Sequence, residues 1–166
     1  MLPLFYLRII MSLLSKNFTL NEYVKSQTAE RKGIDNTITD VEHLEAAEAL
    51  FADVVQRVRD HFGPTIITSG YRSPALNEAI GGSSNSQHCK GEAVDIEVPG
   101  ISNVDLALWI EENLLWDQLI LEFYTPGVPD SGWVHVSYRD TEDNRMETLT
   151  ASRVDGKTVY TKGINA

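Results

Sequence analysis

The sequence predicts an α+β fold in which a small antiparallel sheet is packed against helices. Apolar residues recur at steps of three and four between Thr39 and Phe62, which indicates a long amphipathic helix. Apolar and polar residues alternate over residues 92–98 and 133–138, which indicates strands with one buried face. The chain has 166 residues, of which 42% are hydrophobic, so it can bury one core. We therefore expect one domain over residues 17–166.

Residues 1–16 form an apolar segment ahead of this domain. Its first part, MLPLFYLRIIMSLL, is interrupted by Arg8 and lacks the small residues of a signal-peptidase site. It is also shorter than the roughly 20 residues needed to cross a bilayer. Three interpretations stay open: a weak signal peptide, a docked N-terminal segment, or an upstream extension before a start at Met11.

The first predicted helices have recognisable ends. Thr19 is followed three residues later by Glu22, a capping-box pattern that predicts a short helix beginning near Leu20. The long helix of residues 39–62 ends where Gly63 precedes a proline.

The middle of the chain alternates short elements with turns. Residues 65–68 read as a strand, residues 75–80 as a brief helix, and residues 81–86 as a flexible polar loop. In the strand of residues 92–98, Val94 and Ile96 point to one side. Asp95 therefore points away from the core.

A second amphipathic helix is predicted over residues 103–113. Residues 117–122 and 133–138 then read as two strands of an antiparallel hairpin. Residues 139–166 are polar, have weak strand character at residues 158–161, and contain no motif.

Charge and cysteine content exclude some classes of protein. The net charge is −10 and the isoelectric point is near 4.8, which argues against nucleic acid as a partner, since such surfaces gather Lys and Arg. Cys89 is the only cysteine, so there is no internal disulfide.

Three side chains have the chemistry of a catalytic zinc site. Such a site takes three protein ligands and leaves the fourth position to water. His88, Asp95 and His135 are suitable ligands, each on or beside a predicted strand. Gly91 lets the loop return tightly into the strand, and Ala93 leaves space beside the ion. One Zn²⁺ ion is predicted, while Cys89 is assigned no ligand role because carboxylate and imidazole ligands do not favour a soft thiolate partner.

Hydrolysis with zinc also needs a group that moves protons. Glu122 ends the strand that pairs with the strand of His135, so we predict Glu122 as the general base. Asp130, in a turn nearer to His135 in sequence, is the competing candidate. Trp133 shares the face of His135 and is expected to line the cleft.

These motifs resemble a known family. The string Ser86-x-His88-x-x-Gly91-x-Ala93-x-Asp95, followed by Glu122 and by Trp133-Val-His135, resembles the zinc D-Ala-D-Ala carboxypeptidases and L-alanyl-D-glutamate endopeptidases that act on peptidoglycan. The resemblance implies the fold shared with the signalling domain of Hedgehog proteins, zinc ligation by the two histidines and Asp95, and a general base at Glu122.

The resemblance extends to Ser69-Gly-Tyr-Arg72, where the family uses the arginine to bind the substrate. It implies substrate-binding roles for Arg72 and Ser86. There are departures: many members have a histidine where this chain has Trp133, and others place the catalytic acid at the position of Gly132.

The sequence thus predicts zinc-dependent hydrolysis of a peptide bond in the peptidoglycan stem peptide, of the D-Ala-D-Ala carboxypeptidase type. Two alternatives stay open: an L-Ala-D-Glu endopeptidase of the endolysin kind, and a non-catalytic zinc-binding module of a phage particle. We expect a monomer without a membrane span, synthesised in the cytoplasm and acting on the cell wall, with phage-mediated release as one route of export.

Overall fold

The computed structural model describes residues 12–166. The predicted signal peptide or upstream extension falls mainly on residues 1–11, which lie outside the described residues. From residue 12, β1 (Leu13–Ser15) pairs antiparallel with β2 (Phe18–Thr19). Leu14 and Phe18 are buried in the core. In the described part of the chain, no helix is both long enough and apolar enough to cross a membrane.

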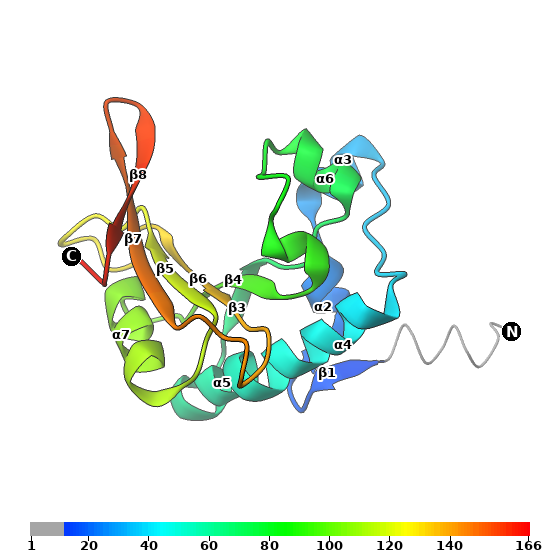
Figure 1. Cartoon of the computed structure of the whole chain (residues 1–166), viewed down its shortest axis with the longest axis horizontal. Helices are drawn as coiled ribbons and strands as arrows, with labels where there is room; N and C mark the ends of the chain where they lie inside the picture. Colours follow the sequence, from blue (N-terminus) through cyan, green and yellow to red (C-terminus); the bar gives the residue numbers. More distant parts are fainter. Residues whose placement is uncertain (1–11) are drawn as a thin grey trace, which may run out of the picture.

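The centre of the molecule is a six-stranded sheet (Figure 1). Its strands, in spatial order, are β3 (Ile66–Ser69), β4 (Ala93–Glu97), β6 (Trp133–Ser137), β5 (Gln118–Glu122), β7 (Glu147–Val154) and β8 (Lys157–Lys162). The predicted antiparallel hairpin of β5 and β6 is confirmed. Neighbouring strands are antiparallel except for β5 and β7, which run parallel. The predicted α+β class is therefore confirmed, with one parallel pair in the sheet.

The alternation of side chains gives this sheet two different faces. On one face, two rows of fully buried apolar residues cross the three central strands: Val94, Val136 and Leu119, and next to them Ile96, Val134 and Leu121. The opposite face carries Asp95 and His135, which lie opposite each other in the register of β4 and β6. The apolar pattern therefore fixes which way these two polar side chains point.

Helices cover the apolar face of the sheet. The predicted long helix is confirmed as α4 (Val41–Leu50), a π-helical segment (Phe51–Val55) and α5 (Gln56–Phe62), one directly following another. The π segment was not predicted, because its buried residues keep the spacing of an ordinary amphipathic helix. Helix α7 (Asn103–Asn113) packs beside it under the sheet (Figure 1).

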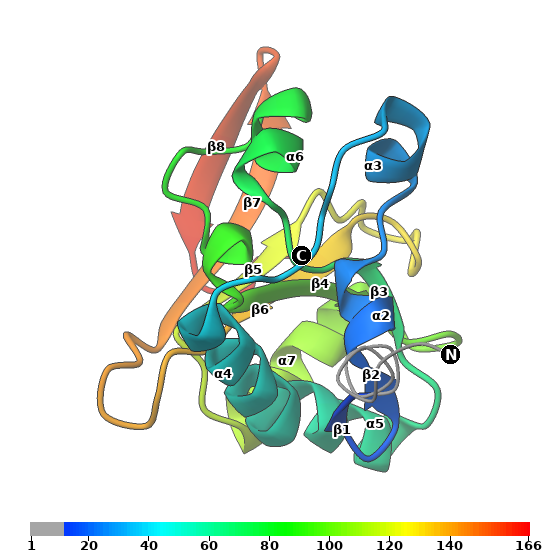
Figure 2. The same cartoon turned by 90° about the vertical axis from the view of Figure 1, so that its right-hand side faces the viewer.

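Two short helices, α3 (Gln27–Lys32) and α6 (Pro74–Ala79), stand on the other side. Helix α2 (Leu20–Val24) packs Tyr23 against Phe51 of the π segment in the core. The predicted capping box is present, because Thr19 Oγ1 accepts the N–H of Glu22 while the Glu22 carboxylate accepts the N–H of Thr19. Figure 2 shows α6 and α3 above the sheet and α4 and α7 below it.

The prediction for residues 139–166 needs correction. The weak strand at residues 158–161 is part of β8, but β7 was missed altogether. Strand β7 buries only the small residues Thr150 and Ala151, and β8 is exposed throughout. Neither strand therefore has the apolar alternation on which strand prediction depends.

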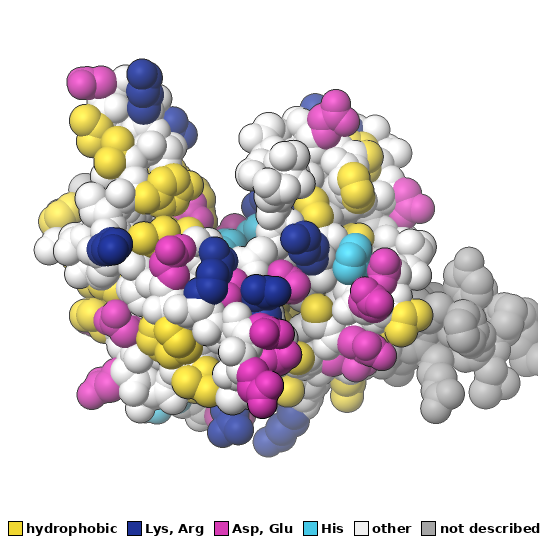
Figure 3. Space-filling view, in the orientation of Figure 1, with side chains coloured by type: hydrophobic (Ala, Val, Ile, Leu, Met, Phe, Trp, Pro, Cys, Tyr) yellow, Lys and Arg dark blue, Asp and Glu magenta, His cyan; other side chains and the backbone are white. Residues whose placement is uncertain are grey.

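The β7–β8 hairpin and the region of α6 rise on either side of the polar face (Figure 1). The space-filling view shows a hollow between these two raised parts, with histidine at its floor (Figure 3). The hollow contains the cluster predicted from the sequence.

Candidate metal centre

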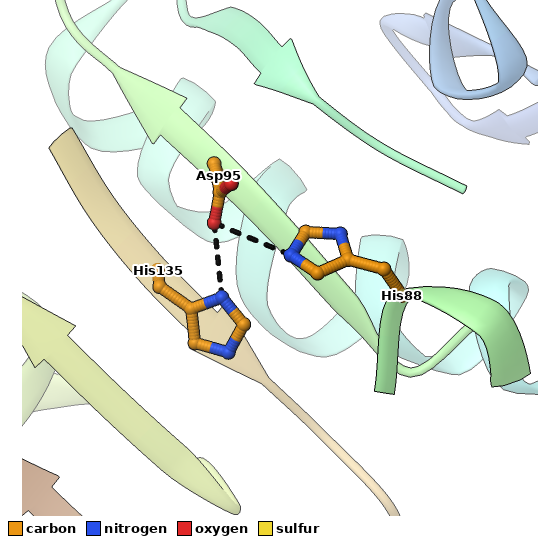
Figure 4. A group of neighbouring side chains, drawn as sticks. All are labelled: His88, Asp95 and His135. Carbon is orange, nitrogen blue, oxygen red and sulfur yellow. Dashed lines mark hydrogen bonds and ion pairs between the residues drawn. The ribbon is translucent and has the colours of Figure 1, made fainter. Parts of the chain in front are cut away.

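The three predicted zinc ligands lie together in this hollow. Asp95 on β4 and His135 on β6 are direct cross-strand partners, and His88 comes from the short 3-10 turn Gln87–Lys90 that precedes β4. Asp95 Oδ1 is 2.9 Å from His135 Nδ1 and 3.4 Å from His88 Nε2 (Figure 4). The structure therefore brings together residues that are 40 positions apart in the sequence.

The His88 ring is oriented by its second nitrogen. Nδ1 lies 2.8 Å from the backbone carbonyl oxygen of Gly70, which can only accept a hydrogen bond. The Nδ1–H therefore donates to Gly70, and Nε2 keeps a lone pair directed toward Asp95. A hydrogen bond of this kind is the usual support of a metal-binding imidazole.

Gly91 has the role expected of it, the tight return of the loop into the strand. Gly91 ends the 3-10 turn with a φ of +72°, and a Cβ there would overlap the backbone carbonyl oxygen of His43. Ala93 is fully buried and its carbonyl oxygen accepts the Tyr23 hydroxyl at 2.9 Å. The tight return of the chain is therefore fixed against helices α2 and α4.

Burial makes the charges in this cluster interdependent. Burial alone would raise the pKa of Asp95, but the adjacent imidazoles of His88 and His135 hold that pKa well below its usual value. Burial lowers the pKa of His88, against the opposing effect of Asp95. A carboxylate and an imidazole without its proton are the forms that bind a metal ion.

The donor set fits zinc. The ligand atoms of His88, Asp95 and His135 all lie within 4.8 Å of one another. With metal–ligand bonds of about 2.0–2.2 Å in a tetrahedral arrangement, two ligand atoms on one ion are separated by roughly 3.3 Å. The two measured separations, 2.9 Å and 3.4 Å, bracket that value. Two imidazoles and one carboxylate also leave a coordination position for water, as in catalytic zinc sites.

Glu122 lies beside the cluster, as predicted. It is two residues beyond Ile120, the cross-strand partner of His135, so all three side chains point to the same face. Glu122 Oε1 is 4.0 Å from His135 Nδ1. Burial, reinforced by the negative charge of Asp95, raises the pKa of Glu122.

Trp133 is the cross-strand partner of Glu122 and lines the same cleft. Its indole Nε1 is buried and has no hydrogen-bond partner within the described chain. The indole nevertheless lies near enough to oppose the rise in the pKa of Glu122. Trp133 therefore places an indole N–H donor next to Glu122, outside regular hydrogen-bond geometry.

The predicted substrate-binding residues also line the cleft. Arg72 Nη2 is 3.7 Å from Asp95 Oδ2, and its guanidinium donates to Ser69 Oγ. Ser86 Oγ accepts the backbone N–H of His88 and so begins the 3-10 turn. The competing base Asp130 is exposed in its turn and is not among the residues that line the cleft.

Sequence reasoning missed several contributors to the cleft and its support. Gln87, Arg145 and Tyr160 line it, and the buried Asp117 holds two of them by hydrogen bonds. Gln87 adjoins His88 in the sequence, and Asp117 begins a predicted strand, so both were within reach of the motifs. Arg145 and Tyr160 lie in the polar C-terminal residues, where no pattern indicated a site.

Comparison with known proteins supports the same assignment. The family model for Peptidase M15 matches residues 16–137, nearly three quarters of the chain. The match contains all the residues predicted to bind zinc, substrate or a proton. It ends before Arg145 and before β7 and β8. A search of curated proteins finds no match.

Proposed function

Because the chain belongs to the peptidase M15 family, and is therefore a zinc metallopeptidase, we propose that it hydrolyses a peptide bond in the stem peptide of peptidoglycan. The cluster of His88, Asp95 and His135 at the floor of the hollow is the observation that carries this proposal. These three residues would hold one zinc ion. The bond cleaved is of the D-Ala-D-Ala carboxypeptidase type.

When bound, zinc supplies a Lewis acid that polarises the scissile carbonyl and lowers the pKa of water. Glu122 moves the proton. Its carboxylate accepts a proton from the attacking water and returns it to the nitrogen of the leaving amine. The position of Glu122, 4.0 Å from His135 and on the same face of the sheet, supports this role, and the exposed position of Asp130 supports it further.

Arg72 holds the substrate. Its planar guanidinium offers paired donors to a carboxylate, and it lies on the far side of Asp95 from His135. Trp133 borders the same cleft, and its indole N–H lies beside Glu122. Ser86 borders the same cleft, although its Oγ is already engaged with the N–H of His88.

One observation favours a second candidate, an L-Ala-D-Glu endopeptidase. The hollow in Figure 3 is open between its two raised sides, which would leave room for a longer segment of the stem peptide. Arg72 would then bind a carboxylate inside the stem peptide and not a terminal one.

Digestion of purified muropeptides, followed by mass spectrometry, distinguishes these candidates. A carboxypeptidase releases one D-alanine from a pentapeptide stem, whereas the endopeptidase separates L-alanine from D-glutamate. The variant Glu122→Gln keeps the size of the side chain and removes the proton acceptor. Its rate is expected to fall about 10²- to 10⁴-fold while zinc is retained.

Asp130→Asn is the matched control and should act at the rate of the parent protein. If Glu122→Gln digests muropeptides as fast as the parent, Glu122 is not the base. A parent protein that holds one zinc ion and yields no product would instead support the non-catalytic module.

The remaining expectations belong to the same proposal. We expect the protein to be synthesised in the cytoplasm. Because the proposed substrate lies outside the membrane, the protein must then reach the cell wall. It acts there as a monomer, in which the domain expected over residues 17–166 also includes β1 (Leu13–Ser15) in its packed core.

A further inference from the structure

A buried carboxylate is hydrogen-bonded to Gln87, the residue before the predicted ligand His88. The side chain of Asp117 is 0% exposed, yet it is the partner of Arg145, whose Nη2 donates to Oδ2 at 2.8 Å. The Nε and the backbone N–H of Arg145 also donate to this carboxylate. The pair spans 28 positions of sequence. It therefore ties the segment after β6 to the beginning of β5.

Gln87 joins this pair to the turn that carries His88. Its Nε2 donates to Asp117 Oδ2 at 2.9 Å and to Glu92 Oε2 at 3.0 Å. The backbone N–H of Glu92 returns to the carbonyl oxygen of Gln87 at 3.1 Å. Gln87, the first residue of the turn, thus bonds to Glu92 just after the turn and to Asp117 before β5.

The other side of the His88 turn has separate supports. His88 Nδ1 is bonded to Gly70, and the His88 carbonyl oxygen accepts the backbone N–H of Arg72 at 3.1 Å. Both of these contacts come from the chain just after β3. The turn is thereby held between two parts of the molecule, one next to β3 and one next to β5.

We propose that Asp117 and Arg145, acting through Gln87, position the His88 turn for zinc and so set the zinc affinity of the site. We name the three residues the Asp117 clamp. The proposal rests on the metal centre described above, but not on which bond the enzyme cleaves. It also assigns a positioning residue, Arg145, to a segment beyond the family match, which ends at residue 137.

A direct substrate-binding role for Arg145 is the competing explanation, because its side chain is 48% exposed and lines the cleft. Two of its nitrogens, however, are already bonded to Asp117. The hydrogen bond to Asp117 and the negative charges of Asp117, Glu147 and Glu92 also raise the pKa of Arg145. An anionic substrate would meet a cation that is largely neutralised.

The first test is Gln87→Ala, which cuts the link and leaves the buried Asp117 and Arg145 paired. Zinc affinity, measured by competition with a chelating dye and without substrate, is expected to fall about 10- to 100-fold, the usual effect of losing a supporting contact. In the zinc-free protein, hydrogen exchange of residues 87–92 should be faster than in the parent. Zinc affinity and exchange both equal to those of the parent would overturn the proposal.

The second test is Arg145→Met, with Arg139→Met as the matched control from the same segment. Arg139 is exposed, and its hydrogen bond uses only the backbone. We expect Arg145→Met to lose zinc affinity about as much as Gln87→Ala, and the double variant to lose no more than either single one, because both act through one link. Unchanged zinc affinity in Arg145→Met together with a raised KM would overturn the clamp and favour substrate binding.

If Arg145→Met fails to fold, Gln87→Ala decides the question, since it leaves no charge unpaired. Zinc affinity does not depend on the substrate, so these results stay interpretable even if the muropeptide assay shows no hydrolysis. If the parent protein binds no zinc, that result contradicts the proposed function itself.

Discussion

Trp133 places a single N–H donor beside Glu122, at a position where many members of the family that the motif resembles carry a histidine. If this donor serves the reaction, Trp133→Phe, which keeps the ring and removes the N–H, should lower kcat about 10-fold or more with little change in KM. Trp133→His should keep more of the activity than Trp133→Phe, because imidazole can restore a donor. The measurement is the kinetics of muropeptide hydrolysis for the three proteins.

Equal rates for Trp133→Phe and the parent would mean that Trp133 contributes only contact area to the cleft. A rise in KM without a fall in kcat would indicate binding that is equally strong in the ground state and the transition state.

The Asp117 carboxylate also makes stability depend on pH. Burial opposes its ionisation, but the hydrogen bonds from Arg145 and Gln87 hold the pKa of Asp117 below its usual value. A lowered pKa in the folded protein means that the stabilisation is complete above the unfolded pKa of about 3.9 and is lost as the pH falls through the folded pKa. The parent should therefore lose more stability in acid than Asp117→Asn does.

Urea unfolding at pH 7 and at successively lower pH measures this effect. The parent and the variant both keep the other carboxylates with lowered pKa values, such as Asp35 and Asp140. Comparing the two proteins therefore cancels the contributions of those carboxylates. A stability difference between parent and variant that is the same at every pH would contradict the prediction.

Among the structural elements, the 3-10 turn before β4 depends most on one glycine. Gly91 has a φ of +72°, and Gly33 after α3 has a similar φ of +64°, but a Cβ would meet nothing within 4 Å at Gly33. Gly33→Ala should therefore cost only the conformational term, about 1–2 kcal/mol. Gly91→Ala should cost about 1–3 kcal/mol more, because the backbone at His43 must move. Denaturant unfolding of both variants tests this. Equal losses of unfolding free energy would show that the backbone of α4 at His43 moves aside without measurable strain.

Prediction from sequence succeeded for elements with a strong pattern. The long helix repeats apolar residues over many turns, and β4, β5 and β6 alternate clearly, so their burial could be recognised. The π segment could not be predicted, since Phe51, Val54 and Val55 would point inward in an α-helix as well. Strand β7 was missed because pairing with β5 buries backbone and small side chains, which leave no apolar signal.

Part of the site was predicted from the same alternation, whereas the roles of Arg72 and Ser86 came from the family resemblance. Once Val94 and Val136 are assigned to the core, Asp95 and His135 must share the opposite face, and the strand of Glu122 follows from the hairpin. The Asp117 clamp could not be foreseen, because it joins Gln87 to Arg145, 58 positions away, through side chains and one backbone N–H that leave no pattern in the sequence.

At the scale of the whole molecule, the proposed zinc site joins the turn before β4 to two strands of the sheet. An ion that binds only the folded protein raises its stability by about 2.7 kcal/mol at a free concentration 100 times its Kd. For a chain of this size we expect a melting temperature roughly 5–10 °C higher with zinc than after chelation. Differential scanning calorimetry measures this shift, and Asp95→Asn should show little of it. The same shift in Asp95→Asn would place the stabilising ion elsewhere.

The spacing of strands also sets which substrates the outermost strand can affect. Tyr160 on β8 pairs with Ala151 on β7, which pairs with Glu122 on β5, so Tyr160 stands two strands, or about 10 Å, from the proposed base. An extended peptide needs about three residues to cover that distance. Tyr160→Ala should therefore slow the cleavage of long, cross-linked muropeptides and leave the rate of cleavage of a dipeptide unchanged. Catalysis and the preference for polymer over fragment would then be separable by a single substitution.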